Sequence, residues 1–381
     1  MLSFELDEEQ LAIRDTIREL VRDRVAPRAA EIDERAEYPH DLQRLFGDNG
    51  ILAIPFPEEY GGVSGSAPMI CMGIEEIAKA CATSSLILAV QALGSYPILL
   101  AGTEEQKRRF CPPLAAGRLA AYALSEAGSG SDAAAMRSVA KRYGDEYVLS
   151  GGKMFITNGS VADTLVVFAR TDPDPSSGPR GISAFVLERD ASPWTTVKLE
   201  HKLGIKGSPT AQIAFDEVRV PAANRLGAEG QGFKLALAVL DRSRPGIGAQ
   251  ALGIAEGAFD YAVAYAKERE QFGRAIADFQ GLQFMLADMA TQIEAARQMV
   301  YLAAGKVDAR APDLTKIAAM AKMFASDAAM RVTTDAVQVL GGYGYLQDHP
   351  VERMMRDAKI TQIYEGTNQI QRVVVSRAIL R

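Results

Sequence analysis

The spacing of apolar residues changes twice along the 381-residue chain, and this feature constrains the fold more than any other. Up to about residue 117, apolar residues recur every three or four positions, as in 11–22, which is typical of amphipathic helices. From about 118 to 225 the apolar runs are short and bounded by turn residues, which is typical of strands; examples are 164–170, 181–188 and 211–220. Beyond about residue 226 long helical spacing returns.

This order predicts an α+β fold with three domains. They are an N-terminal α-helical domain, a middle antiparallel β domain and a C-terminal four-helix bundle, at 1–117, 118–225 and 226–381. The β domain is predicted to be antiparallel because no long helical pattern separates its strands, as a parallel sheet would require. One bundle helix is predicted to bury a face made of residues at helical spacing, namely Met285, Met289, Ile293 and Ala296.

Composition argues against several classes of function. Lys and Arg number 42 and Asp and Glu 48, a formal net charge of −6, and without a long basic run nucleic acid is not an expected partner. The three histidines are isolated, and Cys71, Cys81 and Cys111 lack Cys-x-x-Cys spacing, so we predict buried thiols and no metal site. No window approaches about eighteen uncharged apolar residues, which predicts no membrane span. The acidic N-terminus does not follow the plan of a signal peptide, which favours a cytoplasmic location.

The segment 122–132, Tyr-Ala-Leu-Ser-Glu-Ala-Gly-Ser-Gly-Ser-Asp, is suited to a flat or anionic ligand. Its small residues let a ligand approach the backbone, and Ser125 and Ser131 could donate hydrogen bonds. Gly128 and Gly130 suggest a dinucleotide fingerprint, but the third glycine and the βαβ unit are missing. Taken alone, an ordinary loop is the simpler interpretation.

Other segments are equally ambiguous when taken one at a time. Residues 153–159, Lys-Met-Phe-Ile-Thr-Asn-Gly, could place a ring against a planar heterocycle, or could be a strand entering a turn at Asn158-Gly159. In 241–253, charges precede a stretch of small residues that can pack tightly, and a solvated helix start is the alternative.

Two further segments have features of a phosphate site. Arg269, in Arg-Glu-Gln-Phe-Gly followed by Phe279-Gln280, suits bidentate phosphate contact. Residues 338–344, Gln-Val-Leu-Gly-Gly-Tyr-Gly, form a glycine-rich break at which backbone can meet a ligand.

Glu365 is a single carboxylate between the apolar pair Ile363-Tyr364 and the start of the last predicted helix. The simplest explanation is that it stabilises the N-terminus of that helix, an effect of about 0.3 to 1 kcal/mol.

Together, and in this order, these segments resemble the acyl-CoA dehydrogenase family, most of all its bacterial short- and branched-chain members. The resemblance covers essentially the whole chain, and its most specific part is 363–371, Ile-Tyr-Glu-Gly-Thr-Asn-Gln-Ile-Gln. It implies dehydrogenation of an acyl-CoA thioester to the trans-2-enoyl-CoA, with FAD held without a Rossmann domain. It also implies a homotetramer, arranged as a dimer of dimers, and an electron-transferring flavoprotein as electron acceptor.

The resemblance implies that Glu365 is the catalytic base, which removes the α-proton while flavin N5 takes the β-hydride. The backbone N–H of Glu365 is implied as a donor to the thioester oxygen. Substrate contacts are implied for Ser131, Asp241, Arg244, Tyr364 and Gly366. Cofactor contacts are implied, partly across a subunit boundary, for Tyr122, Leu124, Ser125, Gly130, Ser131, Phe155, Ile156, Thr157, Arg269, Gln271, Phe279, Gln280, Gln338, Val339, Gly341, Gly342, Thr367 and Gln369.

The acyl pocket is expected between 86–100 and 238–246, where Ala92 and Gly94 leave room for several acyl shapes. Acyl chain length and branching do not follow from the sequence.

The chain departs from the family pattern in two places. Phe155 stands where most relatives carry Trp, and Ser125-Glu126-Ala127 replaces Thr-Glu-Pro. Each change keeps a ring or a hydroxyl, so flavin binding is expected to persist. The isovaleryl-type branch places its base at the position of Ser243; because serine cannot act as that base, Glu365 and the main branch are favoured.

The basicity of Glu365 depends on opposing effects. A nearby helix N-terminus lowers a carboxyl pKa, whereas burial by Ile363, Tyr364 and the substrate raises it. We expect burial to prevail once a ligand excludes water.

Four alternative functions stay open. An acyl-CoA oxidase shares the fold and base but passes electrons to oxygen; such enzymes usually carry an extra C-terminal domain, whereas this chain ends soon after Glu365. A dehydrogenase could act on an acyl-carrier-protein thioester instead of acyl-CoA. A flavin monooxygenase of the same fold would not need Glu365, and a non-catalytic thioester-binding protein would not need FAD.

Overall fold

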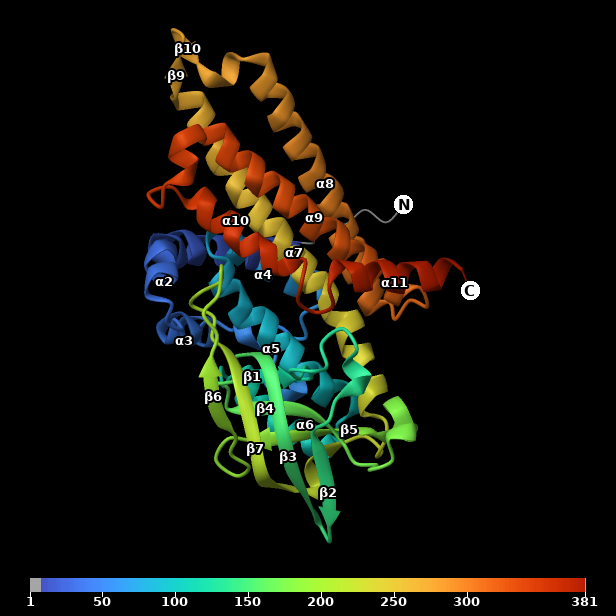
Figure 1. Cartoon of the computed structure of the whole chain (residues 1–381). Helices are drawn as coiled ribbons and strands as arrows, with labels where there is room; N and C mark the ends of the chain where they lie inside the picture. Colours follow the sequence, from blue (N-terminus) through green and yellow to red (C-terminus); the bar gives the residue numbers. More distant parts are fainter. Residues whose placement is uncertain (1–7, 381) are drawn as a thin grey trace.

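The computed structural model describes residues 8–380 and shows an elongated molecule (Figure 1). A β sheet forms one end, long C-terminal helices form the other, and N-terminal helices lie between them. The predicted α+β class, with strands between two sets of helices, is confirmed.

Two of the N-terminal helices begin at side-chain caps. Ser66 accepts a hydrogen bond from the Met69 N–H at 3.3 Å, and Thr103 and Gln106 form a capping box. A short 3₁₀ turn lies at Glu58–Tyr60. The helices are α1 (Glu8–Leu20), α2 (Ala29–Arg35), α3 (His40–Asp48), α4 (Ala67–Ala80), α5 (Ala82–Ala101) and α6 (Glu104–Ala115).

Helix α5 corrects one expectation. Its 20 residues are uncharged and have a mean hydropathy of 1.6, so by length and composition it could cross a membrane. Serine, threonine and glutamine within it hide this apolar character from a simple count. However, 78% of its most apolar window is buried, and α5 packs between the sheet and the C-terminal helices. It is therefore a core helix of this fold.

The sheet has eight strands in the order β6-β7-β3-β2-β4-β5-β8, with β1 paired to β4. The three predicted strands correspond to β4, β5 and β7. Most neighbours are antiparallel, as predicted, but β1 and the first residue of β2 pair with β4 in parallel. The strands are β1 (Ala120–Ala123), β2 (Val139–Tyr143), β3 (Glu146–Thr157), β4 (Thr164–Arg170), β5 (Ile182–Glu188), β6 (Thr195–Leu199), β7 (Thr210–Pro221) and β8 (Arg225–Leu226).

Four C-terminal helices form the bundle, and a fifth follows. They are α7 (Gly232–Glu268), α8 (Gln280–Asp308), α9 (Leu314–Leu340), α10 (Pro350–Thr361) and α11 (Asn368–Ile379). A hairpin of β9 (Glu270–Gln271) and β10 (Arg274–Ala275) joins α7 to α8. The predicted face of α8 is confirmed, because Met289, Ile293 and Ala296 are buried and Met285 packs at the edge of the core.

Helices α4 and α7 touch backbone to backbone. A Cβ atom at Gly253 would lie 2.3 Å from the Glu75 carbonyl oxygen, and one at Gly257 would lie 2.1 Å from that of Lys79. Only glycine allows this approach. The small residues of α7 therefore bring α4 close to the part of α7 that carries the candidate site.

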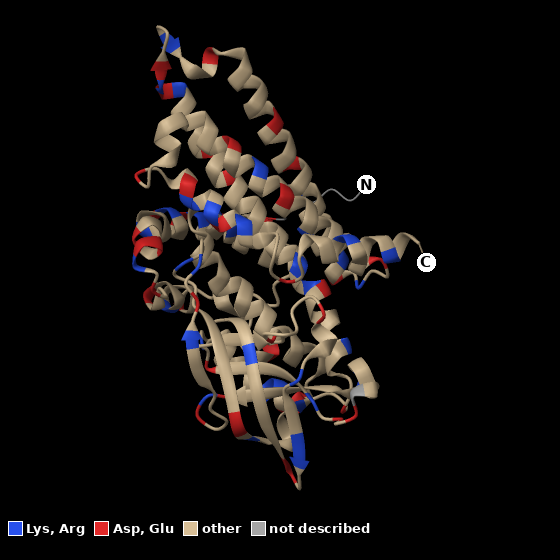
Figure 2. Ribbon diagram, viewed as in Figure 1, with Lys and Arg blue, Asp and Glu red and all other residues tan. Residues whose placement is uncertain are grey.

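Charged groups join α10 to the N-terminal helices and to the loop before β7 (Figure 2). Arg356 pairs with Asp33 at 2.7 Å, and Lys206 approaches the same carboxylate at 3.6 Å. The buried Asp357 carboxylate accepts a hydrogen bond from the Ile205 N–H. These contacts fix α10, and hence the start of the loop that follows it.

Candidate active site

The loop between α10 and α11 holds Glu365 in an uncommon backbone conformation. Glu365 and Gly366 have φ angles of 52° and 90°, and a left-handed conformation is rare for a residue other than glycine. The cap of α11 is Thr367, whose hydroxyl accepts a hydrogen bond from the Ile370 N–H at 3.3 Å. The interpretation that Glu365 serves the N-terminus of this helix is therefore wrong.

The Glu365 carboxylate points inward, where Ser243 of α7 donates a hydrogen bond to it at 2.5 Å. Burial raises the pKa of Glu365 to about 7, against the Ser243 hydrogen bond and the positive charges of Arg244 and Lys322. Burial therefore prevails already without a ligand, and its effect in the presence of a ligand stays a prediction. Ile363 does not contribute the expected shielding, because 47% of it is exposed.

A narrow cavity lies beside this carboxylate between α4, α5 and α7. The space open to a water-sized sphere is about 10 Å³, roughly one water. Its lining is mostly apolar and comprises Ala67, Ile70, Cys71, Ile74, Ala89, Ala92, Tyr96, Arg242, Ser243, Gly246, Ile247 and Glu365.

The two expected segments of the acyl pocket both reach this cavity, through Ala92 and through the residues around Ser243. Gly94 does not, because a Cβ atom there would lie 2.6 Å from the Ala120 Cβ; this glycine instead lets α5 pack against β1. Helix α4 also lines this cavity, through Ile70, Cys71 and Ile74 among others, and the spacing of residues in the sequence did not indicate this.

Tyr122 and Arg244 also lie near Glu365. Burial and the charge of Glu365 raise the pKa of Tyr122, whose hydroxyl lies 3.4 Å from the Ala236 carbonyl oxygen on α7. Arg244 is only 4% exposed and pairs with Asp241 at 2.7 Å. Its Nε has no hydrogen-bond acceptor within residues 8–380. Residues from β1, α7 and the loop after α10 thus meet at one point.

Tyr364 faces elsewhere. Its hydroxyl donates to the Gln250 side chain, which in turn donates to Ser85 at 3.0 Å, and Tyr364 is not among the residues that line the cavity. The implied substrate contact of Tyr364 stays a prediction, and its hydroxyl is engaged by Gln250. Gly366 lies beside the base, and its carbonyl is bound by Lys322.

The chain after β1 is held against β3 by a buried ion pair. Lys153 donates to the Leu124 carbonyl oxygen at 3.0 Å and to Glu126 at 2.8 Å, and the Met154 N–H donates to the Ser125 carbonyl oxygen at 2.9 Å. Burial lowers the pKa of Lys153 to about 8. Lys153 belonged to a predicted ligand segment, but no role was predicted for it.

A bulge in β3 directs neighbouring side chains to opposite sides. Phe155 has a φ of 60° and is 60% exposed, whereas Ile156 is 2% exposed within the core of the β domain. Only the backbone of Ile156 is available to a ligand that stacks on Phe155. Gly130 and Ser131 are exposed and follow closely in sequence the segment that Lys153 anchors. Thr157 is the last residue of β3.

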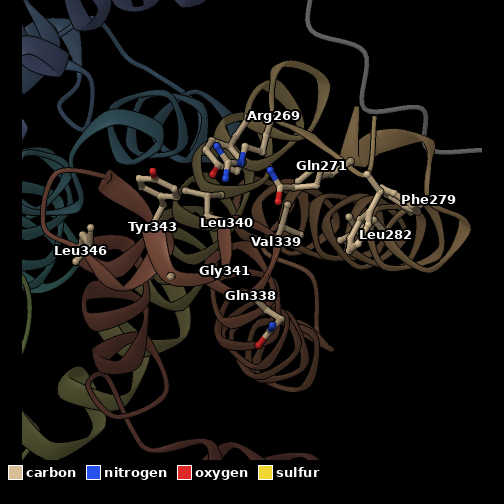
Figure 3. Close-up of a pocket in the computed structure, with 14 residues that line it drawn as sticks. Arg269, Gln271, Phe279, Leu282, Gln338, Val339, Leu340, Gly341, Tyr343 and Leu346 are labelled. Carbon is tan, nitrogen blue, oxygen red and sulfur yellow. The ribbon is translucent and has the colours of Figure 1, made fainter. Parts of the chain in front are cut away.

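The second cavity, of about 580 Å³, lies at the far end of the bundle (Figure 3). It brings together most of the residues implied for the distant half of the cofactor: Arg269, Gln271, Phe279, Gln338, Val339, Gly341 and Gly342. The Arg269 guanidinium lies 5.4 Å above the Tyr343 ring, and Tyr265, Phe272 and Leu282 complete the wall. Gln280 is exposed outside this cavity, as Gln369 is at the start of α11.

The two parts of the candidate cofactor site lie at opposite ends of α7 (Figure 1). Tyr122 meets α7 at Ala236, near its start, and Arg269 directly follows its end. At about 1.5 Å per residue, this stretch of helix is roughly 50 Å long.

Comparison with known proteins agrees with this architecture. Models of the acyl-CoA dehydrogenase N-terminal, middle and C-terminal domains match residues 7–118, 121–218 and 230–380. Probable acyl-CoA dehydrogenase FadE25 of Mycobacterium tuberculosis (strain ATCC 25618 / H37Rv) is 54% identical over 379 residues, which cover 99% of this chain and 97% of that protein.

Two solved structures are similar over their full length. Butyryl-CoA dehydrogenase from Megasphaera elsdenii has a TM-score of 0.97 at 44% identity, with 100% of both chains covered. A chain in "Electron transferring flavoprotein of Acidaminococcus fermentans: Towards a mechanism of flavin-based electron bifurcation" has a TM-score of 0.97 at 49% identity, again with 100% of both chains covered. Since all three domains match, the chain belongs to the acyl-CoA dehydrogenase family, whose members are flavoprotein oxidoreductases.

Proposed function

We propose that this chain is an FAD-dependent dehydrogenase that converts a short acyl-CoA thioester to its trans-2-enoyl form, with Glu365 as the base. The observation that carries the proposal is a half-buried carboxylate at the wall of a narrow apolar cavity, with Tyr122 of β1 close enough for the charge of Glu365 to raise its pKa. The apolar lining suits an acyl chain and the carboxylate suits removal of the α-proton; the cavity itself holds about one water and must widen to admit an acyl group. The similarity to butyryl-CoA dehydrogenase supports a short acyl group.

Glu365 has the properties that this step requires. With a pKa of about 7, its carboxylate is a stronger base than an exposed glutamate and is still ionised at slightly alkaline pH. Ser243 holds one carboxylate oxygen in place. The Glu365 N–H has no acceptor within the described part of the chain, so it can donate to the thioester oxygen as charge develops there. One such donor contributes about 3 kcal/mol to the stabilisation of a transition state.

The residues around Phe155 and Arg269 fit the two ends of FAD. The exposed Phe155 ring offers a stacking surface, and a Cβ atom at Gly130 would meet nothing within 4 Å, so a ligand can approach the backbone there. At the other end, Arg269 suits a pyrophosphate, and Gly341 and Gly342 are equally open. When bound, FAD supplies the acceptor for the β-hydrogen and its electron pair.

One chain cannot provide both ends of a single FAD, because roughly 50 Å of α7 separates them. We therefore infer that a second copy of the chain supplies the Arg269 cavity to each flavin. Phe272, at the tip of the hairpin beside Arg269, is 94% exposed, which supports an interface there. A homotetramer built from two such dimers remains our proposal for the assembly.

We propose an electron-transferring flavoprotein as the acceptor, supported by the similarity to a chain in the Acidaminococcus fermentans structure. The proposal predicts that, with butyryl-CoA, the protein reduces an electron-accepting dye without oxygen and forms little hydrogen peroxide in air. Enoyl-CoA and peroxide are the products to measure. Peroxide formed in equal amount to enoyl-CoA would support the oxidase alternative, and turnover of acyl-carrier-protein thioesters alone would change the substrate.

If the acyl chain occupies the cavity, replacing a lining side chain by a smaller one should change the acyl chain length that the protein prefers. Ile74 lines the cavity, so Ile74→Ala should shift the best substrate towards longer acyl chains. Ile77→Ala is the matched control: Ile77 is buried on the same helix but does not line the cavity. Each variant should lose about 2 to 5 kcal/mol of unfolding free energy. kcat/KM across a panel of acyl-CoA lengths would separate them, and an identical preference in both variants would place the acyl chain elsewhere.

A further inference from the structure

Lys322 is a completely buried lysine in the middle of α9 that the catalytic step proposed above does not use. Its ammonium donates to the Gly366 carbonyl oxygen and to Asn368 Oδ1, each at 2.9 Å. Both acceptors are uncharged, and within residues 8–380 no carboxylate forms an ion pair with it. Because burying a charge without a paired counter-ion costs free energy, packing alone does not explain a lysine here.

Both acceptors belong to the loop that carries the base. Glu365 and Gly366 occupy consecutive left-handed conformations, which must be held by their surroundings. Gln371 donates to the Glu365 and Gly366 carbonyl oxygens at 3.2 and 2.9 Å, from within the loop's own helix. Lys322 binds the Gly366 carbonyl from α9, which ties the loop to the bundle.

Asn368 extends this attachment. Its side-chain nitrogen donates to Ser326 at 2.9 Å and to Asp327 at 2.7 Å, one turn further along α9. The carbonyl of the same side chain accepts from Lys322, so Lys322 also orients Asn368. The position of Glu365 thus depends on a network whose one buried cation is Lys322, among the residues that the structure describes.

The charges that face Lys322 come from three elements. Burial lowers the pKa of Lys322 to about 7; the charges of Glu365 and Asp327 oppose this effect, and that of Arg244 reinforces it. The same groups also act on Glu365. The hydrogen bond from Ser243 and the positive charges of Arg244 and Lys322 all favour the ionised form of Glu365.

We propose that Lys322 is a positioning residue for the proposed dehydrogenation. Its ammonium fixes the backbone of the base loop through Gly366 and Asn368, and while it is protonated its charge favours the carboxylate form of Glu365. Removing the ammonium therefore has two separable consequences, a looser loop and a weaker preference for the charged base.

Three substitutions separate these consequences. Lys322→Met should lower kcat about 100-fold, since small displacements of a reacting group have effects of this size. It should also move the acid limb of the kcat/KM pH profile up by about one unit, because a nearby positive charge is lost. Amide hydrogen exchange over residues 362–371 should become about tenfold faster. In Lys322→Gln, amide hydrogen exchange over residues 362–371 should stay closer to wild type, but the acid limb of the kcat/KM pH profile should still move. In Lys322→Arg, the acid limb should stay at its wild-type position.

Lys79→Met is the matched control, because Lys79 pairs with Glu76 and Glu256 away from the base loop. Lys79→Met should change neither the acid limb of the kcat/KM pH profile nor the amide hydrogen exchange of residues 362–371. If Lys322→Met also changes neither of these two measurements, the proposal is overturned. If the wild-type protein turns over no acyl thioester, the proposed function fails, whereas the exchange measurement still decides whether Lys322 holds the loop.

Discussion

Glu365→Gln is expected to lower kcat/KM for butyryl-CoA by about two to four orders of magnitude, the usual contribution of a general base. Glutamine keeps the size and can still accept the Ser243 hydrogen bond, but it cannot take up a proton. The measurement is enoyl-CoA formation with an artificial electron acceptor. Because Glu365 forms no ion pair within residues 8–380 and glutamine keeps its size, folding and FAD content should be unchanged.

The wild-type pH profile supplies a second signature of the same carboxylate. Glu365 must be ionised to act, so kcat/KM should fall about tenfold per pH unit below about 7. This fall in kcat/KM at low pH should be missing from the residual activity of Glu365→Gln. Glu217→Gln is the matched control, since Glu217 is also a left-handed glutamate but is exposed on the β domain. Full activity in Glu365→Gln would support a flavin monooxygenase instead.

Two inactive variants are expected to restore activity when they share one oligomer. Glu365→Gln has an intact Arg269 cavity but no base. Arg269→Glu has an intact base, but its reversed charge should repel a pyrophosphate. If each flavin site combines the base side of one copy with the Arg269 cavity of another, a mixed dimer contains one site with neither defect. The co-expressed chains, purified through two different tags, should therefore regain FAD and turnover.

Separately expressed and then mixed samples provide the control, since restoration should require exchange of subunits. Each variant alone should stay inactive or poor in FAD. A co-expressed preparation with no more activity than the two variants alone would show that one chain supplies both halves of its site, against the roughly 50 Å between them along α7.

The sequence predicted the class of fold from local patterns, and the family resemblance implied half of the residues that line the Arg269 cavity. Helical spacing located α8 and its buried face, and the glycine break at 341–342 marked the wall of the Arg269 cavity. Strand alternation located β4, β5 and β7, but not the parallel pairing of β1 with β4, which depends on contacts between distant segments.

The remaining features arise only from packing between elements. Cys71 and Ile74 of α4 line the acyl cavity because Gly253 and Gly257 let α4 approach α7, and no periodicity along α4 indicates this. The orientation of Tyr364 likewise depends on packing between elements, because its hydroxyl donates to Gln250 on α7. The sequence indicated no role for Lys153 or Lys322, and only the fold shows that they are buried.

The central claim is that Glu365 removes the α-proton of an acyl thioester held beside bound FAD. Anaerobic mixing of the FAD-loaded protein with butyryl-CoA tests this claim most directly, with flavin absorbance and enoyl-CoA followed in a single turnover. We predict rapid bleaching with one enoyl-CoA formed per flavin in the wild type, and neither event on that timescale in Glu365→Gln. No bleaching in the wild type with any acyl thioester, or bleaching at the wild-type rate in Glu365→Gln, would contradict the account.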